Sequence, residues 1–258
     1  MSTALITGAS GGIGYDLALE HVRRGGDVIL VARSEHKLRE IQSAWQTTYG
    51  VAVHVIAMDL AQRGSAQALY GAVIAKGLTV DILINNAGFG LYGLFEESDV
   101  DRALQMLELN IVALTVLTRL FVADMVRRRS GRIMNVASTA SFQPVPLMTL
   151  YAATKAFVLS FSEALNNEVS GRGVTVTTLC PGPTTTGFQD VAAMHQARMV
   201  DQRLMATSAD VARYGYNAMM RGKTVAVHGT LNKLMAFLVR FTPRGIIVRV
   251  GRMIAEKR

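Results

Sequence analysis

The sequence predicts one α/β domain, a doubly wound parallel sheet of about seven strands with helices on both faces. Short apolar runs alternate strictly with longer segments of helical periodicity, as in right-handed crossovers between parallel strands. The short runs are continuously apolar, as expected for strands covered on both faces. We expect strands at residues 3–7, 27–32, 52–58, 80–85, 132–137 and 174–180, and a weaker one at 224–228.

Helices are expected between these strands. The chain shows no internal repeat and no low-complexity linker, so we expect a single catalytic domain over residues 1–230 and an extension over residues 231–258. A chain of 258 residues can bury a large core without disulfides or metals. The expected helices cover residues 12–24, 34–48, 66–76, 100–129 and 151–170.

Composition excludes several classes of protein. Half of the residues are hydrophobic, which excludes a disordered chain. Cys180 is the only cysteine, which excludes a disulfide framework and is typical of a reducing compartment. No basic segment precedes the first apolar run, as a signal sequence would require, and no run of about 18 uninterrupted apolar residues predicts a membrane span. We expect a cytoplasmic protein.

The net charge of +8 is concentrated near the C-terminus. Residues 221–258 hold nine Lys and Arg residues and one acid, Glu256, so the first 220 residues are electrically balanced. A nucleic-acid binder would need a basic groove with interleaved aromatic residues, and the sequence does not predict one. We therefore expect no nucleic-acid partner.

A glycine-rich loop follows the first expected strand and opens the first helix, with the sequence Thr7-Gly8-Ala9-Ser10-Gly11-Gly12-Ile13-Gly14. Glycine allows the sharp turn and the close approach of a pyrophosphate to the backbone. The free N–H groups and the positive end of the helix dipole would hold that phosphate. A glycine-rich helix start can also be purely structural, but its place between a strand and a helix favours dinucleotide binding.

Three polar side chains near the carboxyl ends of the strands indicate acid–base chemistry. Tyr151 and Lys155 are four residues apart at the start of a helix, so they share one face. A neighbouring ammonium favours tyrosinate and would bring the phenol pKa from near 10 towards the working range. Ser138 follows the fifth strand, where its hydroxyl would orient a carbonyl group. A Tyr-x-x-x-Lys pair alone occurs on many solvated helices, and Ser138 and the glycine loop give it weight.

Over roughly residues 1–230 the chain resembles the short-chain dehydrogenase/reductase family, and more specifically its NADP-preferring carbonyl reductase-like members. The resemblance implies a Rossmann-type fold, with Tyr151 as acid/base, Lys155 as its tuner, Ser138 as carbonyl orienter and Asn110 as proton relay. Order and spacing match throughout. The motifs that carry it are Thr7 to Gly14, Asp59-Leu60, Asn85-Asn86-Ala87-Gly88, Asn110, Ser138, Tyr151-x-x-x-Lys155 and Pro181-Gly182.

The end of the second strand favours NADP(H) as cofactor. An acid there would bond the ribose 2′-hydroxyl and repel a 2′-phosphate, but this chain has Arg33 and Ser34, with no carboxylate until Glu35. A guanidinium can hold a phosphate through paired hydrogen bonds. Arg33 can also be read as an ordinary exposed loop charge, and Asp59, which resembles the adenine-binding residue of the family, as a turn former.

The resemblance extends to the remaining cofactor residues. Thr184 and Thr186 match positions that bond the nicotinamide carboxamide, and Lys155 can also reach the nicotinamide ribose. No metal site is expected. The predicted cofactor residues are Gly8, Ser10, Gly11, Gly12, Ile13, Gly14, Arg33, Ser34, Asp59, Leu60, Asn86, Ala87, Gly88, Tyr151, Lys155, Pro181, Gly182, Thr184 and Thr186.

Methionine and phenylalanine near the site indicate a lipophilic carbonyl substrate. Residues 183–208 match the segment that covers the substrate in the family, and flexible methionines suit an adaptable apolar pocket. We predict that Phe142, Met148, Phe188 and Met194 contact the substrate. Simple packing of the loop onto the core is the alternative reading of such residues.

The basic extension, residues 231–258, contains an expected amphipathic helix. Thr242 reads as its N-cap and Pro243 as its first residue. Such a helix can lie on an anionic membrane surface, which would place the protein at the inner membrane surface. It can equally pack across a subunit interface or over the substrate entrance. The apolar side of the helix carries Ile246, Ile247, Val250, Met253 and Ile254, and the polar side Arg249, Arg252 and Glu256.

Taken together, these features predict an NADP(H)-dependent oxidoreductase that interconverts a carbonyl and an alcohol, with the reductive direction expected. The resemblance implies a homodimer or homotetramer. The alternative is a non-catalytic NADP-binding sensor or scaffold protein.

Overall fold

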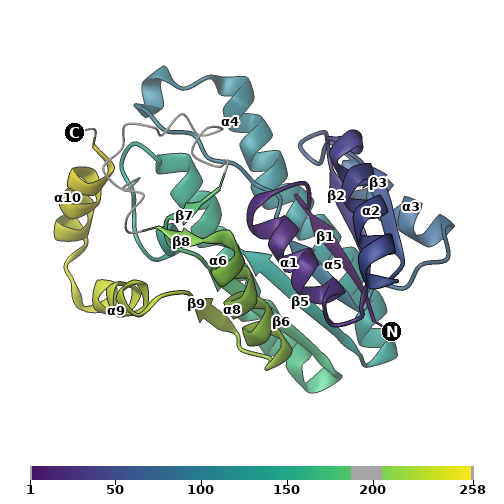
Figure 1. Cartoon of the computed structure of the whole chain (residues 1–258). Coiled ribbons are helices and arrows are strands. Elements are labelled where there is room, and N and C mark those ends of the chain that lie inside the picture. Colours follow the sequence, from purple (N-terminus) through teal and green to yellow (C-terminus); the bar gives the residue numbers. More distant parts are fainter. Residues whose placement is uncertain (1, 187–204, 257–258) are drawn as a thin grey trace.

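The protein folds as a Rossmann-type α/β structure around a seven-stranded parallel sheet, as predicted. A computed structural model describes residues 2–186 and 205–256 of the chain. The strand order is β3-β2-β1-β4-β5-β6-β9 (Figure 1). The strands are β1 (Thr3–Thr7), β2 (Asp27–Ala32), β3 (Val53–Ala57), β4 (Ile82–Asn85), β5 (Gly131–Val136), β6 (Val174–Cys180) and β9 (Val225–Val227), with β7 (Thr184–Thr185) and β8 (Ala206–Thr207) forming a separate pair.

Helices cover both faces of the sheet, and the sheet separates two apolar cores. One core holds side chains of α1, α2 and α8, and the other holds side chains of α3, α5 and the end of α6. The α-helices are α1 (Gly12–Val22), α2 (Glu35–Tyr49), α3 (Ser65–Ala75), α4 (Val100–Leu107), α5 (Leu114–Arg128), α6 (Thr149–Val169), α8 (Ser208–Met220), α9 (Thr230–Leu238) and α10 (Arg244–Ala255).

Burial on both faces explains the apolar sequence of the strands. In β1, consecutive residues Ala4, Leu5 and Ile6 are all fully buried, with Ala4 and Ile6 in one core and Leu5 in the other. The strand β1 pairs in parallel with both β2 and β4. The crossover from β3 to β4 therefore brings the chain back from the edge of the sheet to its centre. The carboxyl ends of β1 and β4 therefore lie side by side, where the strand order reverses.

The long helix expected over residues 100–129 is interrupted. A π-helical segment, Glu108–Ala113, lies between α4 and α5 and contains the buried Asn110. By length and composition, the whole stretch Val100–Arg128 could cross a membrane. Its fully buried residues Met106 and Leu117 pack instead in the apolar cores of the fold. It is a core helix in this structure.

The helices α8 and α9 were not expected from the sequence, and the expected N-cap of α10 is wrong. Thr207 is the N-cap of α8, and its side chain accepts a hydrogen bond from the backbone N–H of Asp210. Before α10, Thr242 does not act as the N-cap, because Pro243 occupies that position. The Thr242 hydroxyl donates instead to the carbonyl oxygen of Leu238 at 3.0 Å, which closes the end of α9.

Candidate active site

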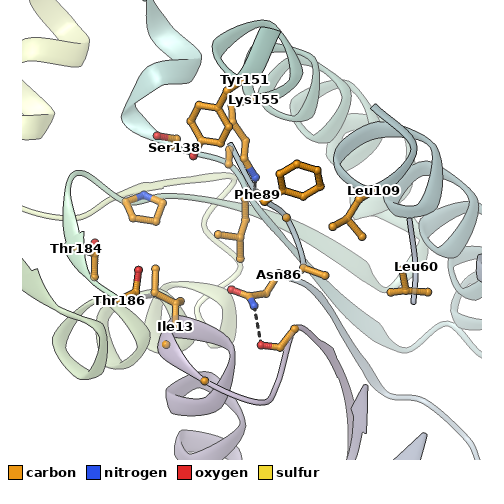
Figure 2. A pocket seen from close by; sticks show the side chains of 18 of the residues that line it. Ile13, Leu60, Asn86, Phe89, Leu109, Ser138, Tyr151, Lys155, Thr184 and Thr186 are labelled. Carbon is orange, nitrogen blue, oxygen red and sulfur yellow. Dashed lines mark hydrogen bonds between the residues drawn. The ribbon is translucent and has the colours of Figure 1, made fainter. Parts of the chain in front are cut away.

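A cavity of about 830 Å³ opens at the carboxyl ends of the strands. It joins the glycine loop, the ends of β2 to β6 and the start of α6, and Figure 2 shows Tyr151 and Ser138 on one side of it and Ile13 of the glycine loop on another. The predicted residues that line it are Gly8, Ser10, Gly11, Gly12, Ile13, Arg33, Ser34, Asp59, Leu60, Asn86, Ala87, Gly88, Ser138, Met148, Tyr151, Lys155, Pro181, Gly182, Thr184 and Thr186.

Three predicted residues of the described part of the chain do not appear in that lining: Gly14, Asn110 and Phe142. Gly14 and Asn110 lie behind the wall and support it, as described below. Phe142, the last residue of the short helix Thr139–Phe142, packs instead against the buried cluster that contains Leu114 and Val158. Phe142 is therefore absent from the described lining, and its contact with substrate stays a prediction. Phe188 and Met194 lie outside the described residues.

The glycine loop has the geometry of an anion cradle. Gly8 has a φ of +68°, and a Cβ there would lie 2.8 Å from Asn86 Nδ2, so only glycine fits. Behind the loop, a Cβ on Gly14 would collide with the carbonyl of Gly8 and with Asn86. Among the described residues no side chain caps α1, and its first turn holds no acid. Its N–H groups and dipole therefore face the cavity, which fits a dinucleotide pyrophosphate.

Hydrogen bonds join the glycine loop to the end of β4. The Thr7 hydroxyl accepts from the backbone N–H groups of Asn86 and Ala87, both at 3.0 Å. Asn86 Nδ2 donates in return to the carbonyl oxygen of Thr7 at 3.0 Å. These bonds fix the floor of the cavity at the point where β1 and β4 meet.

Positive charge gathers at the end of β2. Arg33 and Lys37 both line the cavity, with Ser34 between them. Within residues 2–186 and 205–256, no carboxylate lies within ion-pair distance of either cation. The nearest acid in sequence, Glu35, pairs with Arg39 at 3.2 Å and is absent from the described lining. This end of the cavity therefore suits an anionic group.

The position of Asp59 is compatible with both roles suggested by the sequence, a cofactor-binding residue and a turn former. Asp59 lines the cavity, and its Oδ1 also accepts from the backbone N–H of Ala61 at 3.0 Å. The second contact makes it a turn former after β3.

Ser138 and Tyr151 meet in the wall opposite the glycine loop. Ser138 lies two residues beyond β5, and its Oγ accepts from the backbone N–H of Ala140 at 3.1 Å. Its side chain is also hydrogen-bonded to the Tyr151 hydroxyl. Burial raises the pKa of Tyr151 to about 12, and the bond to Ser138 lowers it in part. At neutral pH the phenol is therefore protonated.

Lys155 lies beneath Tyr151 on the next turn of α6. Its side chain is almost fully buried, and Nζ donates to the carbonyl oxygen of Val136 at 2.8 Å. Burial lowers the pKa of Lys155 to about 8. The Nζ atom lies 5.7 Å from the centre of the Tyr151 ring.

Burial dominates the pKa of the Tyr151 phenol in this structure, and its tuning by Lys155 stays a prediction. We expected the ammonium of Lys155 to lower the pKa of Tyr151, whereas the pKa is raised and burial is the largest cause. Loss of water disfavours the charged form of both groups, so it raises the phenol pKa and lowers the amine pKa.

Asn110 holds the backbone behind the cavity wall. Its Nδ2 donates to the carbonyl oxygen of Phe89 at 3.0 Å and to Thr154 Oγ1 at 3.1 Å. Its Oδ1 accepts from the N–H of Phe89 at 3.2 Å. A Cβ on Gly88 would lie 3.0 Å from this Oδ1 and 3.4 Å from Lys155 Nζ. Asn110 therefore ties the π-helical segment to the chain after β4 and to α6, and π-helical turns are frequent at functional sites.

A second polar connection runs through the core beneath the site. Asn85 Nδ2 donates to Asn135 Oδ1 at 2.9 Å, which links β4 to β5. Asn135 Nδ2 donates in turn to Ser162 Oγ of α6, also at 2.9 Å. These buried bonds fix the strands that carry Ser138 against the helix that carries Tyr151.

The remaining wall of the cavity is mixed in character. Phe89, Leu109, Val145 and Met148 supply apolar surface. Arg102 and Gln105 of α4 add polar groups; the Arg102 guanidinium lies 4.4 Å from the centre of the Phe89 ring and donates to Gln105 Oε1 at 3.1 Å.

The lining residues that were not predicted from the sequence include Lys37, Arg102 and Gly251. Lys37 lies one helical turn after Arg33, and this spacing could have identified it. Arg102 and Gly251 reach the cavity only through the tertiary fold, because α4 and α10 pack at its edge. The sequence has no local signal for either of them.

Comparisons with known proteins agree with this geometry. The sequence model of short chain dehydrogenases matches residues 2–197. A very-long-chain 3-oxoacyl-CoA reductase of Anas platyrhynchos is 35% identical over 69% of this chain and 58% of its own length. An 11-beta-hydroxysteroid dehydrogenase of Pinus massoniana is 38% identical over 69% of this chain and 50% of its own length. The chain thus spans little more than half the length of these relatives.

A solved structure extends the likeness to nearly the whole chain. A short-chain dehydrogenase from Sphingobium yanoikuyae, solved in complex with NADPH, superposes with a TM-score of 0.82. Its sequence is 29% identical, and the match covers 93% of this chain and 94% of that one.

Proposed function

The chain belongs to the short chain dehydrogenase family of oxidoreductases, and on this premise we propose that it is an NADP(H)-dependent enzyme that interconverts a carbonyl compound and an alcohol. One observation carries the proposal. The hydrogen-bonded pair of Ser138 and Tyr151, with Lys155 beneath it, shares one cavity with the uncapped N-terminus of α1.

We assign the proton-transfer role to Tyr151. When bound, the nicotinamide supplies or accepts the hydride. In the reductive direction the Tyr151 hydroxyl, protonated at neutral pH, donates its proton to the carbonyl oxygen of the substrate. The Ser138 hydroxyl orients that oxygen, and the positive charge of Lys155 stabilises the phenolate left behind.

Asn110 acts in this proposal as a positioning residue. Its three hydrogen bonds hold the backbone of Phe89 and the hydroxyl of Thr154, so they fix the wall around Lys155. The proton-relay role implied by the family resemblance stays a prediction.

The preference for NADP(H) rests on Arg33 and Lys37. Their positive charges at the end of β2, which pair with no carboxylate of the described residues, suit a 2′-phosphate, and Glu35 pairs with Arg39 instead. The Sphingobium yanoikuyae structure, which holds NADPH, supports the same choice. We propose the reductive direction for this cofactor.

The substrate is proposed to be lipophilic with one polar group. Phe89, Val145 and Met148 give the cavity an apolar wall, while Arg102 could bind a polar or anionic substituent. The names of the curated relatives, a 3-oxoacyl-CoA reductase and a hydroxysteroid dehydrogenase, support this substrate class.

We further propose a cytoplasmic homodimer or homotetramer. The exposed apolar residues Val100, Leu104 and Val112 lie along α4 and the π-helical segment, and Phe157 lies on α6. Pairing of these helices between subunits would cover them. Sedimentation velocity of the purified chain tests the assembly.

The activity is tested by following NADPH oxidation with a panel of aldehydes, ketones, 3-oxo thioesters and ketosteroids, with NADH in parallel. We expect turnover of lipophilic carbonyls and a preference for NADPH. Tight NADPH binding without turnover of any carbonyl in the panel would favour the alternative, a non-catalytic sensor or scaffold. Turnover restricted to small hydrophilic sugars would contradict the proposed substrate class.

A further inference from the structure

The C-terminal helices expose an unusual amount of apolar surface. Ten of the nineteen exposed large hydrophobic side chains of the described residues lie between residues 231 and 253. The helix α9 has no buried residue at all. We call these ten residues the C-terminal apolar surface: Leu231, Leu234, Met235, Phe237, Leu238, Phe241, Ile246, Val248, Val250 and Met253.

The apolar stripe of α9 faces away from the protein. Leu231, Leu234, Met235 and Leu238 follow the spacing i, i+3, i+4 and i+7, so they share one face, and each is between 43% and 70% exposed. The contacts of α9 with the body come from other residues: Lys233 Nζ lies 5.2 Å from the centre of the Tyr214 ring of α8, and Asn232 lies beside Gly182. A surface helix normally turns this stripe towards the core. The reversed orientation indicates an external partner.

The helix α10 has two different faces. Ile247, Gly251 and Ala255 are buried at spacings of four residues. On this side Gly251 lines the cavity, and the carbonyl oxygen of Ala255 accepts from the Tyr92 hydroxyl at 2.7 Å. The opposite side presents Ile246 and Met253, 50% and 57% exposed. The apolar side predicted for this helix is therefore divided: Ile247 is buried towards the body of the protein, whereas Ile246 and Met253 lie on the surface.

Positive charge accompanies this surface. Residues 231–258 contain seven Lys and Arg residues and one acid, Glu256, which pairs with Arg252 at 2.7 Å. In the described ranges, Arg240, Arg244 and Arg249 are exposed and make no ion pair. Figure 1 shows α9 and α10 together at the side of the molecule away from α2 and β3, so this charge lies on one side.

We propose that residues 231–258 dock the protein on an anionic lipid bilayer. The apolar side chains of α9 and α10 would enter the boundary between headgroups and acyl chains, while Arg240, Arg244 and Arg249 bind lipid phosphates. A second copy of the chain fits less well, because a symmetric contact through this surface would bring the unpaired arginines of both copies together. This inference does not depend on the proposed activity.

Docking would also place the cavity near the lipid. The helix α10 lines the cavity with Gly251 on one side and presents Ile246 and Met253 to the bilayer on the other. A lipophilic molecule leaving the bilayer would therefore meet the cavity edge directly.

The charge dependence is tested by vesicle co-sedimentation of the full chain without substrate. We expect binding to vesicles of phosphatidylcholine mixed with phosphatidylglycerol, and weak binding to phosphatidylcholine alone. The triple variant Arg240→Gln, Arg244→Gln, Arg249→Gln should lower the partition coefficient roughly 100-fold, about fivefold per arginine. The matched control Arg23→Gln, Lys76→Gln, Arg172→Gln removes three exposed charges elsewhere and should leave binding almost unchanged.

The apolar contribution is tested with Leu234→Gln and Phe241→Gln together, against Ile74→Gln on α3. All three side chains are at least half exposed, so folding should be preserved. We expect the pair to lose vesicle binding and Ile74→Gln to retain it. Absence of binding by the native chain, or equal loss in the control variants, would overturn the proposal. So would dissociation of an oligomer by the Leu234→Gln, Phe241→Gln pair, because the surface would then be a subunit interface.

Discussion

The Nζ atom of Lys155 lies 2.8 Å from the carbonyl oxygen of Val136, the last residue of β5. This bond holds an ammonium group in a place where water does not reach it, because Lys155 is only 5% exposed. The arrangement positions a positive charge beneath Tyr151 at a cost in stability. Active sites commonly carry such a cost.

The first prediction concerns the pH dependence of stability. The pKa of Lys155 is lowered from 10.5 to about 8 on folding. Between these pH values the unfolded chain holds the proton and the native chain does not, so this lysine makes stability rise with pH. Below pH 8 the native state carries the full cost, about 3 kcal/mol.

Lys155→Met should therefore abolish this rise while keeping the protein folded. Loss of the hydrogen bond to Val136 offsets part of the gain at pH 7. We expect the unfolding free energy of the native chain to increase relative to the variant from pH 8 to pH 10.5, as measured by urea denaturation. Parallel curves for the two proteins would mean that Lys155 does not lose its proton in that window.

The second prediction concerns the pH dependence of the rate. If the positive charge of Lys155 stabilises the phenolate of Tyr151, kcat for carbonyl reduction should fall as the pH rises through about 8. Below that value the ammonium form dominates and the rate should be level. A kcat that rises through pH 8 would show that the neutral amine is the active form.

The third prediction tests cofactor preference. Arg33→Gln combined with Lys37→Gln removes the two cations that line the cavity at the end of β2. Each charge-assisted hydrogen bond contributes about 1.5–3 kcal/mol, so KM for NADPH should rise at least roughly tenfold. KM for NADH should change little. Arg23→Gln, an exposed cation on the opposite end of α1, serves as the control, and an equal effect on both cofactors would contradict a 2′-phosphate site.

The fourth prediction concerns His21 in α1, which is buried far from the cavity. Its Nε2 faces the carbonyl oxygen of Ser2 at 3.0 Å and therefore carries the proton, so Nδ1 accepts from the Tyr216 hydroxyl at 2.8 Å. Burial lowers the pKa of His21 below its usual 6.5. Stability from the neutral ring is present above pH 6.5 and is lost as the pH falls.

His21→Gln should remove this part of the acid sensitivity. We expect the native chain to lose unfolding free energy relative to the variant as the pH is lowered from 6.5, measured by thermal unfolding across that range. His36→Gln, which removes an exposed imidazole, should follow the native curve. An unchanged acid profile in His21→Gln would place the sensitivity elsewhere.

The sheet could be predicted because its strands are buried on both faces. Three of the seven expected strands have the observed bounds, and the others differ by one or two residues at one or both ends. Burial on both sides leaves a continuous apolar run, which the sequence shows directly. The helix α8 also had a readable signal in Thr207 and Asp210, at the spacing of a capping box.

The features that could not be predicted depend on tertiary contacts. The π-helical segment around Asn110 is held by the backbone of Phe89 and by α6, which are distant in sequence. Phe142 was expected at the cavity because it lies on the loop between Ser138 and Tyr151, but it ends a short helix and packs against the cluster that contains Leu114 and Val158. The raised pKa of Tyr151 follows from burial, and sequence spacing alone shows only that Lys155 is near.

The most direct measurement is the rate of carbonyl reduction by Tyr151→Phe, with the best substrate of the panel and saturating NADPH. Circular dichroism and NADPH binding should match the native protein, because only one hydroxyl is removed. We predict that kcat falls at least about 100-fold, the usual contribution of a general acid. A folded, NADPH-binding variant that reduces the substrate at the native rate would contradict the account, because the Tyr151 hydroxyl would then not deliver the proton.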